Sequence, residues 1–217
     1  MGEHIVGAIK RYFPVAIPKD TAETKLRRYV AAVASHSKAV IAAHWSTVVM
    51  IVISVIAVYC RDLTEDKALR VFLLELHRQL GLLILIVVPL RVAFRQWLGF
   101  VDYGTPMHFI LRWARNATHL ALYAGLVITP ILGWASTNAH RISVKLLGAL
   151  PLPNLVAPDA DLADMLTDYH TWTFYALAAA VAQHACAALF HHFVLRDGIL
   201  MAMLGGCGGR KRMQSAK

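Results

Sequence analysis

Four long apolar segments, separated by charged stretches, set the pattern of this chain. They run over residues of about 39–60, 71–94, 116–139 and 169–195. At a rise of about 1.5 Å per residue, a helix over each segment is long enough to cross a hydrocarbon layer of about 30 Å. The pattern therefore predicts an all-α membrane protein, a four-helix transmembrane bundle of up-down topology.

The second segment is the least regular, because it contains Glu75, His77, Arg78 and Arg91. Its uncharged core, residues 79–90, has only 12 residues. A core of this length does not define a transmembrane helix by itself. We expect it to span because its neighbours span and the chain must alternate between the two sides.

Polar, basic stretches flank the bundle. The expected division is a basic extension over residues 1–38, a four-helix domain over 39–195 and a basic tail over 196–217. Within the extension, residues 4–13 (HIVGAIKRYF) fit either a helix lying on the membrane surface or a solvated segment. No apolar run followed by a cleavage site is present, so we expect no cleaved signal peptide.

Composition and charge support a membrane protein and give its orientation. Hydrophobic residues make up 58% of the chain and charged residues 16%, against roughly 25% charged in soluble domains. Of the 22 Lys and Arg residues, 16 lie in residues 1–38, 91–115 and 196–217. The positive-inside rule places these stretches, and so both termini, on the cytoplasmic side of the membrane. Because the net charge of +9 gathers at the ends of apolar segments, we expect lipid, and no nucleic acid, as its partner.

The cysteines exclude two kinds of site. Cys60, Cys186 and Cys207 form no CxxC or CxxCH motif, which excludes covalent haem attachment and the usual cysteine zinc sites. A metal-ion transporter is also disfavoured, because the spanning cores almost lack carboxylates.

The fourth segment has no Asp, Glu, Lys or Arg, yet it carries His170, His184, His191 and His192. His170 and His184 are 14 residues apart, so their side chains leave the same helix face about 21 Å apart along the axis. Two imidazoles at two depths on one face suggest two stacked haems, whereas zinc requires clustered ligands.

Depth along the segments pairs each of these two histidines with another. His44, near the cytoplasmic end of the first segment, is level with His184, and His77, near the outer end of the second, is level with His170. This predicts one bis-imidazole iron site on each side of the membrane. The alternative for each histidine is a simple hydrogen bond between helices. Bis-imidazole haem iron suits electron transfer more than oxygen binding.

The remaining histidines near the cytoplasmic interface are His119, His191 and His192. We expect them to be interfacial or to support the ligands. His191 follows His184 by seven residues, on nearly the same face, so it is the second choice for the inner ligand.

Arg78 directly follows His77 and is a cation inside the outer half of the second segment. It is expected either to pair with a haem propionate or, with Arg141 and Lys145, to attract a small anion. The alternative is that its side chain reaches to the membrane surface without a further role.

At these residues the chain resembles the bacterial cytochrome b561 family of four-helix di-haem membrane proteins. The resemblance covers about residues 38–207 and rests on KAVIAAHW, HRQLGLLILIVVPLRVAFR, HLALY, TPILGW, RISVKLLGALPLP, LADMLTDYHTW and QHACAALFHHFVLRDGILMAMLGG. It implies two haem b groups, with iron held by His44 and His184 on the inner side and by His77 and His170 on the outer side. These are the same pairs that depth predicts.

The resemblance also implies a location, the bacterial inner (plasma) membrane, and a function. Members look like electron carriers between the periplasmic side and ubiquinone or another quinone. One branch oxidises superoxide, so Arg78 would steer that anion and the activity would be that of a superoxide:ubiquinone oxidoreductase, or of quinol-linked electron transfer. The second hypothesis is a membrane anchor and electron conduit for a separate dehydrogenase or periplasmic cytochrome, docked by residues 140–168. The extension over residues 1–38 departs from the pattern of this family and leaves the choice of redox partner open.

Overall fold

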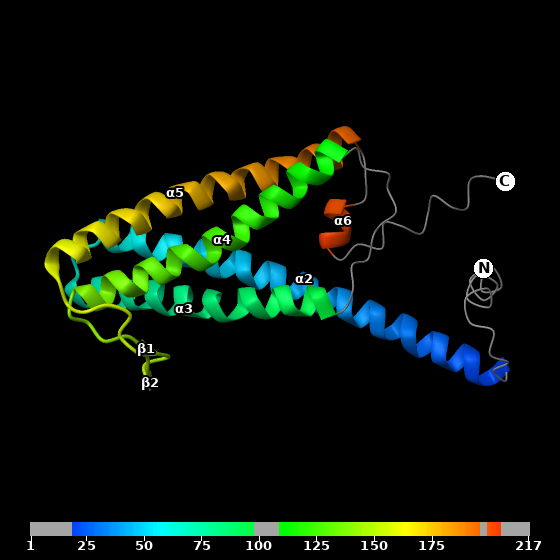
Figure 1. The fold of residues 1–217 in the computed structure, drawn as a ribbon, viewed down its shortest axis with the longest axis horizontal. Coiled ribbons are helices and arrows are strands. Elements are labelled where there is room, and N and C mark those ends of the chain that lie inside the picture. The colour runs from blue at the N-terminus through cyan, green and yellow to red at the C-terminus, as the bar shows by residue number, and fades with distance from the viewer. Residues whose placement is uncertain (1–18, 98–108, 196–198, 205–217) are drawn as a thin grey trace. The chain divides into compact units, whose positions relative to one another are not determined.

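The structure, a computed structural model, describes residues 19–97, 109–195 and 199–204. The chain divides into two units, residues 1–39 and 40–217. The helices are α2 (Lys19–Leu63), α3 (Lys67–Trp97), α4 (Phe109–Ala139), α5 (Ala160–Phe190) and α6 (Ile199–Met203), with a π-helical turn, η1 (His191–Leu195), and two short strands, β1 (Lys145–Leu146) and β2 (Leu150–Pro151) (Figure 1).

The expected fold class is confirmed. Four helices are long and apolar enough to cross a membrane, over Lys38–Leu63, Lys67–Ala93, Arg112–Ala139 and Ala160–Leu195. Large apolar side chains on the outer faces of these helices are exposed, as with Val49, Ile53 and Ile56 on α2. An apolar outer surface of this extent suits lipid as its surroundings.

Two helices begin earlier than the apolar pattern shows. α2 starts at Lys19, directly after Pro18, and residues 19–38 contain no Gly or Pro and many good helix formers. α5 starts at Ala160, because the Asp159 carboxylate accepts a hydrogen bond from the Leu162 backbone N–H at 2.9 Å and caps the helix. The acidic stretch before residue 169 is therefore the first part of α5. Residues 4–13, the candidate surface helix, lie outside the described residues.

The core of the bundle is a small apolar cluster contributed by α3, α4 and α5. Its buried members are Ile84, Val88, Leu126 and Leu177, and α2 adds the partly buried Met50 and Ile51. α4 can approach α5 closely because residue 125 is glycine. A Cβ there would lie 3.0 Å from Leu177 Cδ1.

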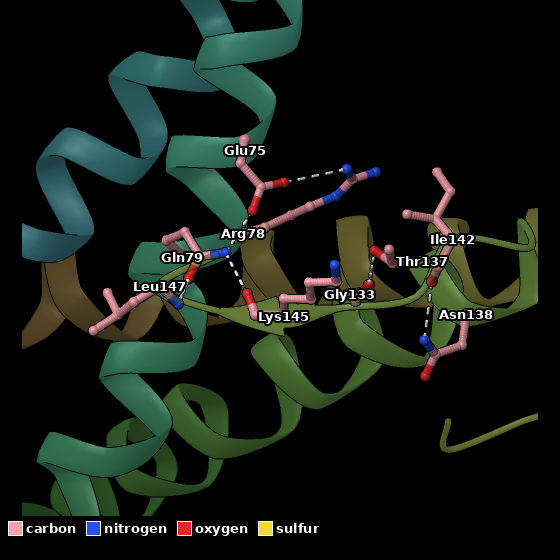
Figure 2. A network of polar contacts seen from close by, with 9 residues as sticks. All are labelled: Glu75, Arg78, Gln79, Gly133, Thr137, Asn138, Ile142, Lys145 and Leu147. Atoms are coloured by element: carbon pink, nitrogen blue, oxygen red, sulfur yellow. Dashed lines mark hydrogen bonds and ion pairs between the residues drawn. The ribbon is translucent and has the colours of Figure 1, made fainter. Parts of the chain in front are cut away.

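The loop between α4 and α5 is folded and tied to two helices. β1 and β2 pair antiparallel, with Leu146 opposite Leu150. The buried Asn138 donates from Nδ2 to the Ile142 carbonyl (3.1 Å) and accepts at Oδ1 from the Leu155 N–H (2.9 Å). The Gln79 amide of α3 donates to the Lys145 carbonyl and accepts from the Leu147 N–H, both at 2.8 Å (Figure 2).

Candidate functional site

His77 on α3 and His170 on α5 face each other, with ring centroids 5.9 Å apart and planes at 86°. His170 Nδ1 lies 2.8 Å from the Thr129 carbonyl oxygen. His77 Nδ1 lies 3.1 Å from the Ser54 carbonyl oxygen and 2.8 Å from the Ser54 hydroxyl. A ring nitrogen that faces a carbonyl must be the protonated one, so each ring keeps an unprotonated Nε2 able to bind a metal.

The pair expected on the inner side is His44 on α2 and His184 on α5, with ring centroids 6.4 Å apart and planes at 68°. His44 Nδ1 is buried and has no hydrogen-bond partner among the described residues. Next to His44, the Trp45 indole N–H donates to the Met203 carbonyl at 2.8 Å and ties α6 to α2. The structure thus brings both predicted pairs together.

His119 on α4, expected from the sequence to be interfacial or to support the ligands, also lies at this inner pair. Its ring centroid lies 5.4 Å from that of His184, with planes at 77°. Its Nδ1–H donates to the Arg115 carbonyl, at 2.7 Å. The signal in the sequence was weak: His119 lies three residues inside its predicted segment, near the inner end, whereas His184 lies eleven residues from the inner end of its own. His191 and His192 lie in η1, and the His192 ring contacts Phe193, with centroids 4.8 Å apart.

The residues present fit a haem at each pair. Two imidazoles that share one metal ion through bonds of about 2 Å hold their centroids roughly 6 Å apart, close to both observed separations. Nδ1–H donors to backbone carbonyls are the usual support of a ligating histidine. In the described part of the chain, no three His, Cys, Asp or Glu side chains gather so as to hold a metal ion alone. Each imidazole pair would supply two ligands to a haem iron, and the porphyrin would supply the others.

Residue 133 is glycine where α4 passes the His170 ring. A Cβ at this position would lie 3.0 Å from both Cε1 and Nδ1 of His170, closer than ordinary van der Waals contact. The absence of a side chain thus lets the imidazole reach the Thr129 carbonyl.

We expect Gly133→Ala to displace the His170 ring, at a cost of about 1–3 kcal/mol typical of overpacking. The low-spin EPR signal of an outer haem should shift or broaden. Gly81→Ala is the matched control, because its Cβ would lie 3.6 Å from Pro130 Cβ, an ordinary contact. Equal spectra for Gly133→Ala and the parent protein would contradict the close fit at His170.

Arg78 lies beside the outer pair and is held by Glu75. Its guanidinium Nη1 lies 3.7 Å from Glu75 Oε2, and its side chain is 22% exposed. Arg78 Nε is buried and has no hydrogen-bond partner among the described residues. Gln79 also donates to Glu75, so one carboxylate joins Arg78 to the residue that holds the β1–β2 hairpin, residues 145–151, called the outer hairpin because it is expected on the outer side (Figure 2).

Two further cations predicted for the outer side lie in the loop held by Gln79 and Asn138. The backbone carbonyl of Lys145 accepts the Gln79 hydrogen bond, and the Lys145 side chain is exposed. Arg141 is exposed and adopts a positive φ of 65° just after α4. The structure thus places Lys145 next to the helix that carries Arg78.

Comparison with known proteins agrees with this geometry. The family described as prokaryotic cytochrome b561 matches residues 35–206. Cytochrome b561 homolog 2 of Escherichia coli (strain K12) is 31% identical over 134 residues, 60% of this chain and 70% of that protein. Cytochrome b561 homolog 1 of the same organism is 27% identical over 172 residues, 77% of this chain and 96% of that protein. A probable superoxide oxidase, CybB, of Yersinia pestis is 24% identical over 166 residues, 74% of this chain and 90% of that protein.

The family match covers most of the chain, including all four spanning segments and both histidine pairs. This multi-pass membrane protein therefore belongs to the prokaryotic cytochrome b561 family, whose members are membrane electron-transfer cytochromes that bind haem b.

Proposed function

We propose that this protein is a di-haem b cytochrome that transfers electrons between the periplasmic side and the quinone pool. The observation that carries the proposal is the presence of two facing imidazole pairs at two depths of one four-helix bundle. On the charge pattern, both termini are cytoplasmic, so His77 and His170 belong to the outer haem and His44 and His184 to the inner haem.

Bound haem b supplies one-electron redox chemistry, and the chain supplies orientation and an apolar surrounding. On α4, Leu126 lies between His119 and Thr129 in sequence, and on α5, Leu177 lies between the two ligand positions. The buried core that these leucines form with Ile84 and Val88 therefore separates the two sites by an apolar layer. This layer would keep water out of the space between the two sites.

The specific reaction that we propose is superoxide oxidation at the outer side coupled to quinone reduction. Two superoxide anions each give up one electron and leave as oxygen, and one quinone takes up the two electrons and two protons to become a quinol. Arg78, partly exposed and beside His77, would raise the local concentration of the anion. The relative named as a probable superoxide oxidase supports this choice of donor.

Arg78→Gln should slow the superoxide-driven reduction of the haem by roughly tenfold at low ionic strength, because electrostatic steering is lost. Stopped-flow mixing at several salt concentrations measures the rate, and the effect should shrink as salt rises. Arg70→Gln is the matched control. It removes a cation from the same helix about 12 Å further out and should have a much smaller effect. A parent rate that is independent of salt, or equal effects of both substitutions, would overturn the steering role.

A second candidate function is a membrane anchor and electron conduit for a separate dehydrogenase or periplasmic cytochrome. The folded loop over residues 140–159 favours it, because Asn138 and Gln79 would present a fixed surface to a partner. Stoichiometric co-purification of a redox subunit, lost when this loop is changed, would support the conduit over the superoxide reaction.

A further inference from the structure

The outer hairpin and its flanks have a composition that is rare in water-facing loops. Residues 141–158 contain two cations, Arg141 and Lys145, and no Asp or Glu. The same stretch carries five leucines: Leu146, Leu147, Leu150, Leu152 and Leu155. Acidic residues resume only at Asp159, which caps α5. Apolar residues with cations and without anions are typical of segments that lie at a membrane surface.

The tip of the hairpin holds a leucine where the backbone favours another residue. The Ala149 N–H donates to the Leu146 carbonyl at 3.2 Å, and the two residues between them, Leu147 and Gly148, have φ of 51° and 71°. Turns with two positive φ angles favour Asn-Gly. The Leu147 side chain is nevertheless 69% exposed, and that of Leu150 is 58% exposed. Packing within the described chain does not account for two leucines here.

Gln79 of α3 holds the hairpin through two hydrogen bonds to its backbone. Gln79 is the first residue of the uncharged stretch of α3, two positions after His77. The His77 ring meets His170, and the uncharged stretch of α5 begins beside it at Tyr169. Two spanning helices thus change from charged to apolar at the level where the hairpin is held, next to α3 (Figures 1 and 2).

We propose that the hairpin of residues 145–151 inserts into the outer leaflet of the membrane at its interface. Leu147 and Leu150 enter the acyl-chain region, and Lys145 with Arg141 lies at the lipid phosphates. Three observations favour lipid over a protein partner. The hairpin is held at the polar-to-apolar boundary, its charge is wholly positive and complements anionic lipid, and Leu147 and Leu150 are exposed.

Spin-label accessibility tests this in the full-length haem-loaded protein, in nanodiscs of phosphatidylethanolamine and phosphatidylglycerol. The native cysteines Cys60, Cys186 and Cys207 are replaced by serine, and a nitroxide is attached at Leu147→Cys. Val49→Cys, on the exposed apolar face of α2, is the lipid reference. Asp161→Cys, exposed in the first turn of α5, is the solvent reference. Oxygen concentrates in lipid and a nickel chelate in water, so power saturation with each reports the surroundings of the label.

We expect the oxygen-to-nickel collision ratio at residue 147 to be several-fold above that at residue 161 and close to that at residue 49. A ratio equal to that at residue 161 would overturn the proposal, because the tip would then lie in water. Low collision rates with both reagents would also overturn it, since a protein partner or a second copy would then cover the tip.

Two variants carrying the same label at residue 147 test which residues hold the hairpin in the membrane. Gln79→Leu should lower the ratio toward the solvent value, because the hydrogen bonds that set the depth are lost. Lys145→Glu should lower it in nanodiscs with phosphatidylglycerol more than in nanodiscs without it. The reduced-minus-oxidised haem spectrum must match that of the parent in each case. An unchanged ratio in both variants would overturn the roles given to Gln79 and Lys145.

Discussion

If the protein is the proposed di-haem superoxide oxidase, His170→Gly should lower its haem content from two groups per chain to one and abolish its reaction with superoxide. The reason is that His170 is the only imidazole whose ring contacts His77 among the described residues, so the outer iron would lose one of its two protein ligands. Haem-to-protein stoichiometry by the pyridine haemochrome assay measures the loss. The inner haem should be retained, because its ligands, His44 and His184, lie on other helical turns.

Two controls separate the loss of a ligand from the loss of the fold. His140→Leu removes another outer-side histidine whose Nδ1 also bonds a backbone carbonyl, that of Ser136 at 2.8 Å, and it should retain both haems. Added imidazole should restore the outer haem in His170→Gly, because the glycine leaves room for a free ligand. Two haems in His170→Gly without imidazole would rule out the outer assignment.

His44→Leu should remove the inner haem, whereas His119→Leu should keep both haems. The choice needs an experiment, because His184 faces His44 at 6.4 Å and His119 at 5.4 Å between ring centroids. His44 has a buried Nδ1 without a partner among the described residues. Its centroid distance to His184 is also closer than that of His119 to the roughly 6 Å expected for two imidazoles on one metal ion. His119, bound to Arg115 of its own helix, is expected to pack against His184 and orient it.

Stoichiometry and EPR on the same samples distinguish the two roles. In His119→Leu, the low-spin signal of the inner haem should shift without losing intensity, and His119→Phe should keep it nearer the parent position because an aromatic ring still packs on His184. The reverse result, loss of a haem in His119→Leu and retention in His44→Leu, would make His119 and His184 the inner pair.

The apolar pattern predicted the fold class because lipid imposes a simple constraint. A chain in a hydrocarbon layer must satisfy its backbone hydrogen bonds within itself, so an uncharged run of about 20 residues specifies a helix without reference to its neighbours. The start of α5 at Ala160 lies outside this argument, because it depends on the Asp159 cap rather than on apolar content. The early start of α2 is likewise a matter of local helix propensity in a polar stretch.

The sequence by itself determined the four spans, the family resemblance and the depth of each histidine, since depth follows from a fixed rise per residue. The structure places the rings of both predicted pairs together. Only the tertiary structure decided which groups orient those rings, namely the carbonyls of Ser54 and Thr129, and that His119 contacts His184. It alone showed that Gln79 holds the outer hairpin. These contacts join different helices or a helix and a loop, so they depend on how each helix is rotated and packed, which depth and periodicity along one segment do not specify.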